Sequence, residues 1–239
     1  MKLAVMQPYF LPYIGYFHLL DAADTFVILD TVKYPKGGWV NRNRILIQGR
    51  ESWLTVPVAS GGENIFDKSY ILDKKFFEKV RSTVTRAYPK AHRLTSFLKL
   101  IEEWQDSENT AVSEVNMFFI IEFLKVLERP LPIFIDAGSL DVGDSVGQER
   151  ILRIAKVLGA SQYINLPGGE TIYDKGRFED SGVELLFVQS NFAPYRQRSE
   201  SFVPRLSALD FFLNEDGDSG AWFGPRSYQI SPPHLGFDT

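Results

Sequence analysis

Apolar and polar residues alternate along the first 30 positions in a way that predicts two strands around a helix. Leu3–Met6 is a short apolar run typical of a buried strand, and residues 26–29 form a second one. Between them, residues 12–23 place apolar side chains on one face of a predicted helix. A strand, a helix and a strand in succession form a βαβ unit, in which the two strands lie parallel. The pattern therefore predicts an α/β fold.

The rest of the chain continues this mixture of elements. Apolar runs around a polar, glycine-containing turn predict a hairpin over residues 45–56. Helical periodicity and short apolar runs predict the remaining helices (73–87, 94–104, 112–127, 145–158, 174–180 and 206–213) and strands (133–136, 162–165 and 184–188). We expect one domain over residues 1–230, with a parallel, Rossmann-like sheet and a helical insertion at about 73–130, followed by a loose tail at 231–239.

Composition narrows the classes of function. The chain has 239 residues, of which 44% are hydrophobic, enough to bury a full core. It contains no cysteine and three widely spaced histidines, which excludes disulfides and thiolate chemistry and argues against a metal site. A net charge of -4 argues against general nucleic-acid binding, and an aromatic content of 14% permits a homodimer interface. No apolar run reaches about 18 residues and no signal-peptide pattern is present, so we expect a cytoplasmic protein without membrane contact.

The segment after the first predicted strand, residues 7–16, is rich in rings and is called the elbow below. It lies where α/β proteins usually bind a ligand, at the carboxyl end of a strand. Its prolines restrict the backbone, its glycine permits a close approach, and each tyrosine offers a flat face with a hydroxyl. The ligand-binding candidates are Gln7, Tyr9, Tyr13, Gly15 and Tyr16, and Tyr13 is also a candidate catalytic residue. The alternative is a rigid turn packed into an aromatic core.

A cationic segment follows the second predicted strand. Lys33, Lys36, Arg42 and Arg44 fall close together in an otherwise acidic chain. If residues 41–44 are extended, both arginines point to one face, where they can hold a phosphate or a carboxylate. The candidate binding residues are Lys33, Trp39, Asn41, Arg42 and Arg44, with Asp30 at the end of the strand as a candidate proton acceptor. The alternative is a solvated, weakly paired run of charges.

Two later segments are further candidates. Gly168 and Gly169 follow a predicted strand and can present backbone N–H groups to an anion, although a plain connection explains them equally well. Tyr173 follows them, and Tyr195 and Gln197 precede the last predicted helix. On that helix Ser207, Asp210 and Asn214 share one face, which we interpret as its solvated side. No Ser–His–Asp spacing and no Gly-x-Ser-x-Gly segment is present, which argues against a serine hydrolase.

These motifs together resemble the WbqC-like family. The resemblance covers residues 2–214, and its first motif, Met6–Phe17, is specific. It continues through Asp30, Gly38–Ile45, 158–160, 167–169, Tyr173, 178–182, Tyr195, Gln197, Phe202, Pro204, 206–207, Asp210 and Asn214. The chain departs from the family pattern before Tyr195, where a His-Pro pair is replaced by Phe192 and Ala193. If that histidine were a catalytic base, this chain would lack it.

WbqC-like proteins typically accompany bacterial surface-polysaccharide or other amino-sugar pathways. The resemblance implies an acyl or aminoacyl transferase acting on a nucleotide-linked amino sugar or a similar phosphate-bearing substrate, in polysaccharide or secondary metabolite biosynthesis. The cofactor is unknown; a thioester is a candidate acyl donor, and an acyl carrier protein is then a candidate partner. On this hypothesis the cationic segment holds the phosphates, Asp30 takes the proton of the attacking amine, and Gln7, Tyr9 and Tyr13 hold the acceptor.

A more distant similarity is to the HIGH-type nucleotidyltransferases, which open with the same strand, glycine-containing helix start and second strand. Their His-x-Gly-His motif stabilises a transferring phosphoryl group, whereas residues 13–16 here read Tyr-Ile-Gly-Tyr. We therefore expect a nucleotidyltransferase-like fold without nucleotidyl transfer. Nucleotidyl transfer and a non-catalytic sugar-nucleotide-binding module are the alternatives.

Overall fold

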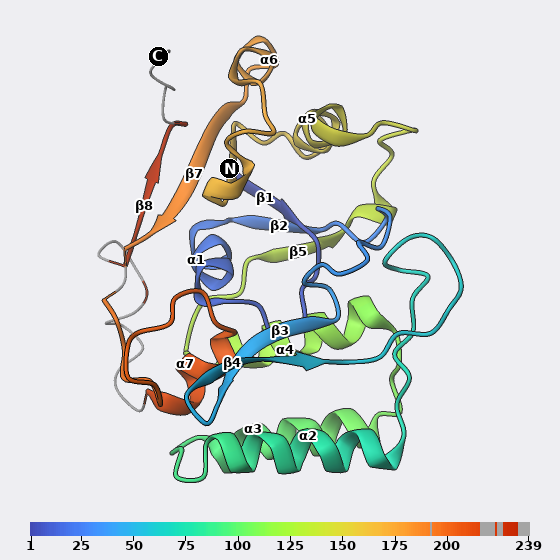
Figure 1. Cartoon of the computed structure of the whole chain (residues 1–239). Helices are drawn as coiled ribbons and strands as arrows, with labels where there is room; N and C mark the ends of the chain where they lie inside the picture. Colours follow the sequence, from blue (N-terminus) through green and yellow to red (C-terminus); the bar gives the residue numbers. More distant parts are fainter. Residues whose placement is uncertain (192, 216–222, 224–226, 234–239) are drawn as a thin grey trace.

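A six-stranded, mostly parallel sheet forms the centre of the computed structural model, which describes residues 1–191, 193–215, 223 and 227–233 (Figure 1). Its strands lie in the order β5 (Ile133–Asp136), β2 (Thr25–Ile28), β1 (Lys2–Met6), β6 (Gln162–Asn165), β7 (Glu184–Ser190) and β8 (Tyr228–Ser231). The first five are parallel, and β8 pairs antiparallel with β7. The predicted α/β fold with a parallel sheet is therefore confirmed.

Helices cover both faces of this sheet (Figure 1). On one face lie α5 (Gly147–Leu158) and α6 (Lys175–Asp180); on the other lie α1 (Ile14–Ala22), α4 (Val112–Val126) and α7 (Ala208–Asn214). Because side chains alternate along a strand, β1 contributes to two hydrophobic clusters: Leu3 and Val5 belong to the one with α5 and α6, and Ala4 to the larger one. Both faces of β1 are therefore buried, as its uniformly apolar sequence predicts.

A separate two-stranded hairpin and three helices occupy the chain between β2 and β5. The hairpin pairs β3 (Arg42–Ile47) with β4 (Arg50–Thr55), as predicted. The helices α2 (Lys74–Ala87), α3 (Leu94–Asp106) and α4 fill the predicted insertion, and α2 and α3 lie farthest from the sheet (Figure 1). That the chain forms one domain over residues 1–230 stays a prediction.

The strand order of the sheet reverses direction at one place, between β1 and β6. From β1 the chain moves first to β2 and β5 on one side, and later to β6 and β7 on the other. In open α/β sheets, ligands bind beyond the carboxyl ends of the strands at such a point. The elbow leaves the carboxyl end of β1 there, and residues 166–169 leave β6 beside it.

The end of the chain differs from the prediction. The predicted tail begins at residue 231, but Ser231 belongs to β8, whose Tyr228 pairs with Ser190. Four residues of mixed polarity carry no strand pattern of their own, and the pairing with β7 defines the strand. The rest of the predicted tail, residues 234–239, lies outside the described residues. Among the described helices, none is both long and apolar enough to cross a membrane.

Candidate functional site

Buried polar side chains fix the backbone of the elbow. Asn116 of α4 donates to the carbonyl of Pro8 (2.9 Å), and Asn43 of β3 donates to that of Leu11 (2.9 Å). Ser207 donates to the same Leu11 carbonyl (2.7 Å), where the backbone has a positive φ of 43°. The elbow is therefore held from three distant segments, and its unusual conformation is stabilised by contacts rather than by glycine.

The tyrosines of the elbow divide into one buried and two half-buried rings. Tyr16 is fully buried and donates to the carbonyl of Gln7 (2.9 Å), so its role is structural. Tyr9 and Tyr13 are half-buried, and burial raises the pKa of both hydroxyls, that of Tyr13 to about 12. Both hydroxyls therefore stay protonated near neutral pH and can donate hydrogen bonds to a ligand.

Asp30 lies beyond the carboxyl end of β2, as predicted. Its Oδ2 accepts a hydrogen bond from the hydroxyl of Ser113 in the first turn of α4 (2.7 Å). The side chain is half-buried, and this burial raises the pKa of its carboxyl. The hydrogen bond from Ser113 offsets part of this rise, and the nearby Asp136 at the end of β5 adds to it. A carboxyl with a raised pKa at this edge of the sheet is suited to accept and return a proton.

Two arginines and two tryptophans form a row beside the hairpin: the half-buried Arg42 and Arg44 of β3, the exposed Trp53 of β4 and the exposed Trp39 of the preceding loop. Arg42 lies over the ring of Trp53 (4.2 Å), and Arg44 lies near the ring of Trp39 (5.6 Å). The two tryptophan rings are neighbours, 5.4 Å apart. Arg44 also pairs with Glu51 (2.5 Å), a half-exposed ion pair worth little on its own. Exposed rings flanked by guanidinium groups are suited to stack on a planar ligand.

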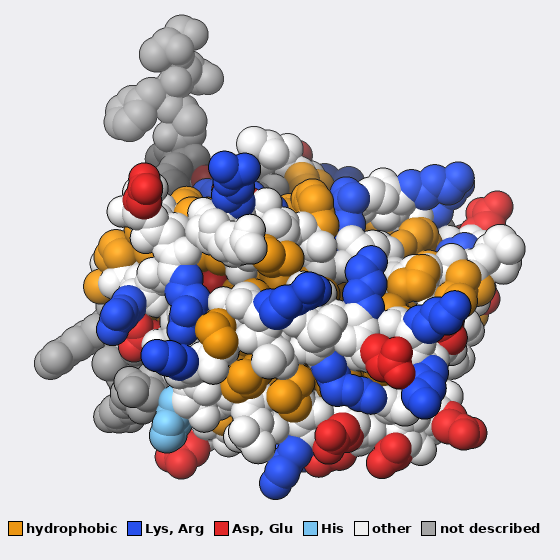
Figure 2. Space-filling model, turned by 60° about the horizontal axis from the view of Figure 1, so that its bottom comes forward, with side chains coloured by type: hydrophobic (Ala, Val, Ile, Leu, Met, Phe, Trp, Pro, Cys, Tyr) orange, Lys and Arg blue, Asp and Glu red, His pale blue; other side chains and the backbone are white. Residues whose placement is uncertain are grey.

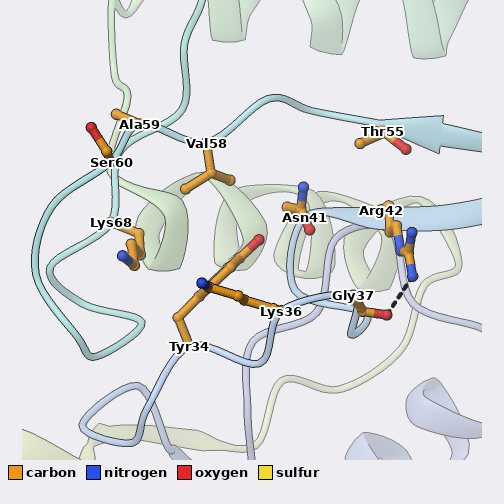
Figure 3. A pocket seen from close by; sticks show the side chains of 10 residues that line it. All are labelled: Tyr34, Lys36, Gly37, Asn41, Arg42, Thr55, Val58, Ala59, Ser60 and Lys68. Carbon is orange, nitrogen blue, oxygen red and sulfur yellow. Dashed lines mark hydrogen bonds between the residues drawn. The ribbon is translucent and has the colours of Figure 1, made fainter.

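A cleft of about 430 Å³ opens beside this row (Figure 3). Its lining comes from loop 34–37, from the start of β3 and from the segment after β4. The lining residues are Tyr34, Lys36, Gly37, Asn41, Arg42, Thr55, Val58, Ala59, Ser60 and Lys68. Three of them are cationic and none is acidic, which is notable in a chain of net charge -4. Lys and Arg side chains also spread over much of the face seen in Figure 2.

Two of the three cations are already oriented by backbone carbonyls. Arg42 donates to the carbonyls of Gly38 (3.3 Å) and Gly37, and Figure 3 shows the second contact. Lys68 donates to the carbonyl of Gly62 (2.8 Å) and lies 5.4 Å from the ring of Tyr34. Such contacts hold the cationic groups in place before a ligand arrives, which lowers the entropic cost of binding it.

The structure joins the elbow and the cationic segment by contacts, but the cleft lining contains no elbow residue. The N–H of Phe10 donates to the carbonyl of Trp39 (3.1 Å). Arg44 donates to the carbonyl of Arg205 (3.2 Å), and the charge of Arg205 acts on the hydroxyl of Tyr13. Lys33 is exposed, pairs with Asn64 through its backbone and does not line the cleft. The arginine–tryptophan row therefore contacts both regions: Arg42 lines the cleft, and Trp39 bonds to the elbow at Phe10.

The glycine loop after β6 is a short 3₁₀ turn, Pro167–Gly169. Gly168 is exposed, whereas Gly169 is buried, and a Cβ at residue 169 would lie only 2.8 Å from the Asn165 amide. Tyr173 bonds to the hydroxyl of Tyr163 (3.1 Å) and to the Asn165 amide (3.3 Å). These contacts give Gly169 and Tyr173 a packing role, and leave Gly168 open to solvent.

Tyr195 and Gln197 face the protein interior. The hydroxyl of Tyr195 donates to Asp210 (2.8 Å), which also accepts from Tyr88 (2.7 Å), and Gln197 exchanges two hydrogen bonds with the backbone of Val203. Asp210 is fully buried, so the interpretation of its helix face as solvated is wrong. The physical reason is that tyrosines from two distant segments satisfy the carboxylate.

Some lining residues of the cleft were not anticipated. Lys68, Ser60 and Thr55 belong to segments that read as surface loop or hairpin, and an isolated lysine carries no signal of a site. The described residues contain no group of three or more His, Cys, Asp or Glu side chains that could hold a metal ion. The position of Phe192 lies outside the described residues.

Comparisons with known proteins place the chain in a family. The model of the WbqC-like protein family matches residues 7–221, so the chain belongs to this family. It is also similar to the uncharacterized protein Rv1507c of Mycobacterium tuberculosis (strain ATCC 25618 / H37Rv), with 27% identity over 233 residues, 89% of this chain and 93% of that protein. No solved structure matches the chain significantly.

Proposed function

We propose that this member of the WbqC-like family transfers an acyl or aminoacyl group to a nucleotide-linked amino sugar or a similar phosphate-bearing substrate. The observation that carries the proposal is the cleft lined by Lys36, Arg42 and Lys68 without a carboxylate. Its volume of about 430 Å³ lies within the range of small-molecule sites. Clustered guanidinium and ammonium groups favour phosphate oxygens over uncharged ligands.

The remaining parts of the substrate find partners next to the cleft. The exposed rings of Trp39 and Trp53 offer a stacking surface for a nucleobase or a sugar ring. Asp30 precedes the loop that lines the cleft, and its backbone carbonyl accepts from Phe66 in the opposite loop (3.1 Å). We assign Asp30 the role of taking the proton from the attacking amine, and Tyr9 and Tyr13 that of hydrogen-bonding the acceptor.

The acyl donor in this proposal is a thioester or another activated acyl group, which an acyl carrier protein could deliver. The core is proposed to be Rossmann-like, because its five parallel strands follow the order third, second, first, fourth, fifth along the chain. Dinucleotide-binding sheets have this order. Nucleotidyl transfer, the second candidate, rests on analogy of fold alone. It predicts release of pyrophosphate from a nucleoside triphosphate with Mg²⁺.

Mass spectrometry of reaction mixtures tests the proposal. Acetyl and glycyl thioesters are incubated with UDP- and dTDP-linked amino sugars, and a product heavier by the acyl group is expected. Arg42→Ala and Asp30→Ala should lower turnover, whereas Arg86→Ala, on the exposed face of α2, should leave it unchanged. Turnover that persists in both site variants would exclude these roles, and pyrophosphate release instead of acylation would favour the second candidate.

A further inference from the structure

A serine and a histidine that lie far apart in the sequence meet at the carboxyl end of β7. Ser190 is the last residue of β7 and is exposed, whereas His18 of α1 is fully buried. The Ser190 Oγ and the His18 Nδ1 lie 2.9 Å apart, within hydrogen-bond distance. In the tautomer that carries its proton on Nε2, the imidazole accepts the serine hydroxyl proton at Nδ1.

The same place explains why residue 15 is a glycine. A Cβ at Gly15 would lie 3.0 Å from the Ser190 Oγ and 2.4 Å from Cε2 of Tyr13. The serine hydroxyl and the half-buried tyrosine ring therefore converge on a position without a side chain. Gly15 belongs to the first turn of α1, the end of the helix whose dipole attracts negative charge.

Aromatic rings pack against the imidazole of His18. Its ring lies 5.3 Å from the ring of Phe223 and 5.3 Å from that of Tyr228 on β8. Tyr228 is itself anchored, because its hydroxyl donates to Asp21 of α1 (2.9 Å) and Arg129 pairs with the same carboxylate (2.6 Å). The ring is thus held against the exposed serine by packing that does not depend on a ligand.

We propose that Ser190 is an acyl-accepting nucleophile and that His18 is its base. A serine next to a base within hydrogen-bond distance is the arrangement of an activated nucleophile. The substrate class is an activated acyl compound, a thioester or an ester. The Ser190 Oγ forms a bond to the acyl carbon while its proton passes to His18 Nδ1. The bond from the acyl carbon to sulfur or oxygen then breaks, and the leaving thiol or alcohol takes that proton.

The acyl-serine ester has two routes of resolution. Attack by water gives a free acid, and attack by an amine gives an amide. In both cases His18 takes a proton from the attacking group and passes it to the departing Ser190 Oγ. On the amine route His18 therefore takes the role that Asp30 has in direct transfer. Only the amine route rests on the proposed function. Formation of the ester does not depend on the basic cleft, so it can be tested separately from binding of the phosphate-bearing substrate.

The experiment follows acetylation of the full chain by p-nitrophenyl acetate. Peptide mapping by mass spectrometry should find acetyl-Ser190, formed at least about 100-fold faster than acetyl-Ser181, because a general base contributes about 10²–10⁴-fold. Ser181 is a suitable internal reference, because it is exposed and its hydroxyl donates to the carbonyl of Arg177 rather than to an imidazole. Ser190→Ala should abolish the fast reaction, and Ser181→Ala should preserve it.

The role of the base is tested with His18→Gln, whose fold is checked by circular dichroism. Acetylation of Ser190 should slow at least about 100-fold in this variant. Equal acetylation rates at Ser190 and Ser181 in the native chain would overturn the proposal. An unchanged acetylation rate at Ser190 in folded His18→Gln would also overturn it. If Arg42→Ala loses UDP-sugar binding but the native chain forms no acetyl-Ser190, the inference about Ser190 is refuted and the proposed function is not.

Discussion

The buried amide of Asn116 allows a quantitative test of how the elbow is held. The amide makes three hydrogen bonds: it donates to the carbonyls of Pro8 (2.9 Å) and Val40 (2.7 Å) and accepts from the hydroxyl of Tyr70 (2.7 Å). In Asn116→Ala the Tyr70 hydroxyl donates to the Val40 carbonyl instead (3.0 Å), but the Pro8 carbonyl loses the Asn116 amide. Two donated bonds at about 1 kcal/mol each, with an added penalty of about 1–3 kcal/mol for the buried Pro8 carbonyl left unpaired, give a loss of about 3–5 kcal/mol.

Urea unfolding followed by circular dichroism measures this loss as a change in the free energy of unfolding. For a chain of this size, each kcal/mol corresponds to about 2–4 °C in the melting temperature, so a decrease of about 6–20 °C is expected. Asn191→Ala is the control, because that residue is exposed, and a change within about 0.5 kcal/mol is expected there. A loss below about 1 kcal/mol in Asn116→Ala would contradict the account of the elbow.

Three further predictions concern Tyr195, Asp210 and Glu51. Tyr195→Phe removes one of two tyrosine hydrogen bonds to Asp210 and should cost about 1–3 kcal/mol of unfolding free energy, measured with urea; a neutral effect would contradict the buried network. Burial raises the pKa of Asp210, so its ionisation opposes folding. The native chain should therefore lose stability relative to Asp210→Asn as pH rises from about 4 through the raised pKa, and a difference that does not vary with pH would refute this. Glu51→Gln removes only a half-exposed partner of Arg44 and should change the melting temperature by the equivalent of less than about 1 kcal/mol; a larger change would mean that the pair orders the hairpin.

The first βαβ unit could be predicted because its signals are local. Leu3–Met6 is apolar throughout and lies in the middle of the sheet, where both faces of a strand are buried. The strand β8 could not be predicted in this way, because Tyr228–Ser231 takes its conformation from pairing with β7. Short strands of mixed polarity depend on their neighbours more than on their own sequence.

The residues of the candidate site also differ in whether local sequence indicates them. The run of cations in the sequence includes Arg42 and Lys36, which line the cleft, whereas Lys68 comes from a loop whose position depends on the fold. The buried Asp210 was misread because its two tyrosine partners come from distant segments. Likewise, the contact of Ser190 with His18 joins residues 172 positions apart, a separation at which no spacing motif can indicate it.

The central claim is that the basic cleft binds the phosphates of the substrate, and calorimetric titration with UDP tests it most directly. The proposal gives Arg42 a charge-assisted hydrogen bond to a phosphate oxygen. Such a bond is worth about 1.5–3 kcal/mol, so Arg42→Ala should raise the Kd for UDP about 10-fold or more. Arg86→Ala, an exposed arginine on α2, should bind UDP as the native chain does. Equal affinities in the native chain, Arg42→Ala and Arg86→Ala would contradict the claim.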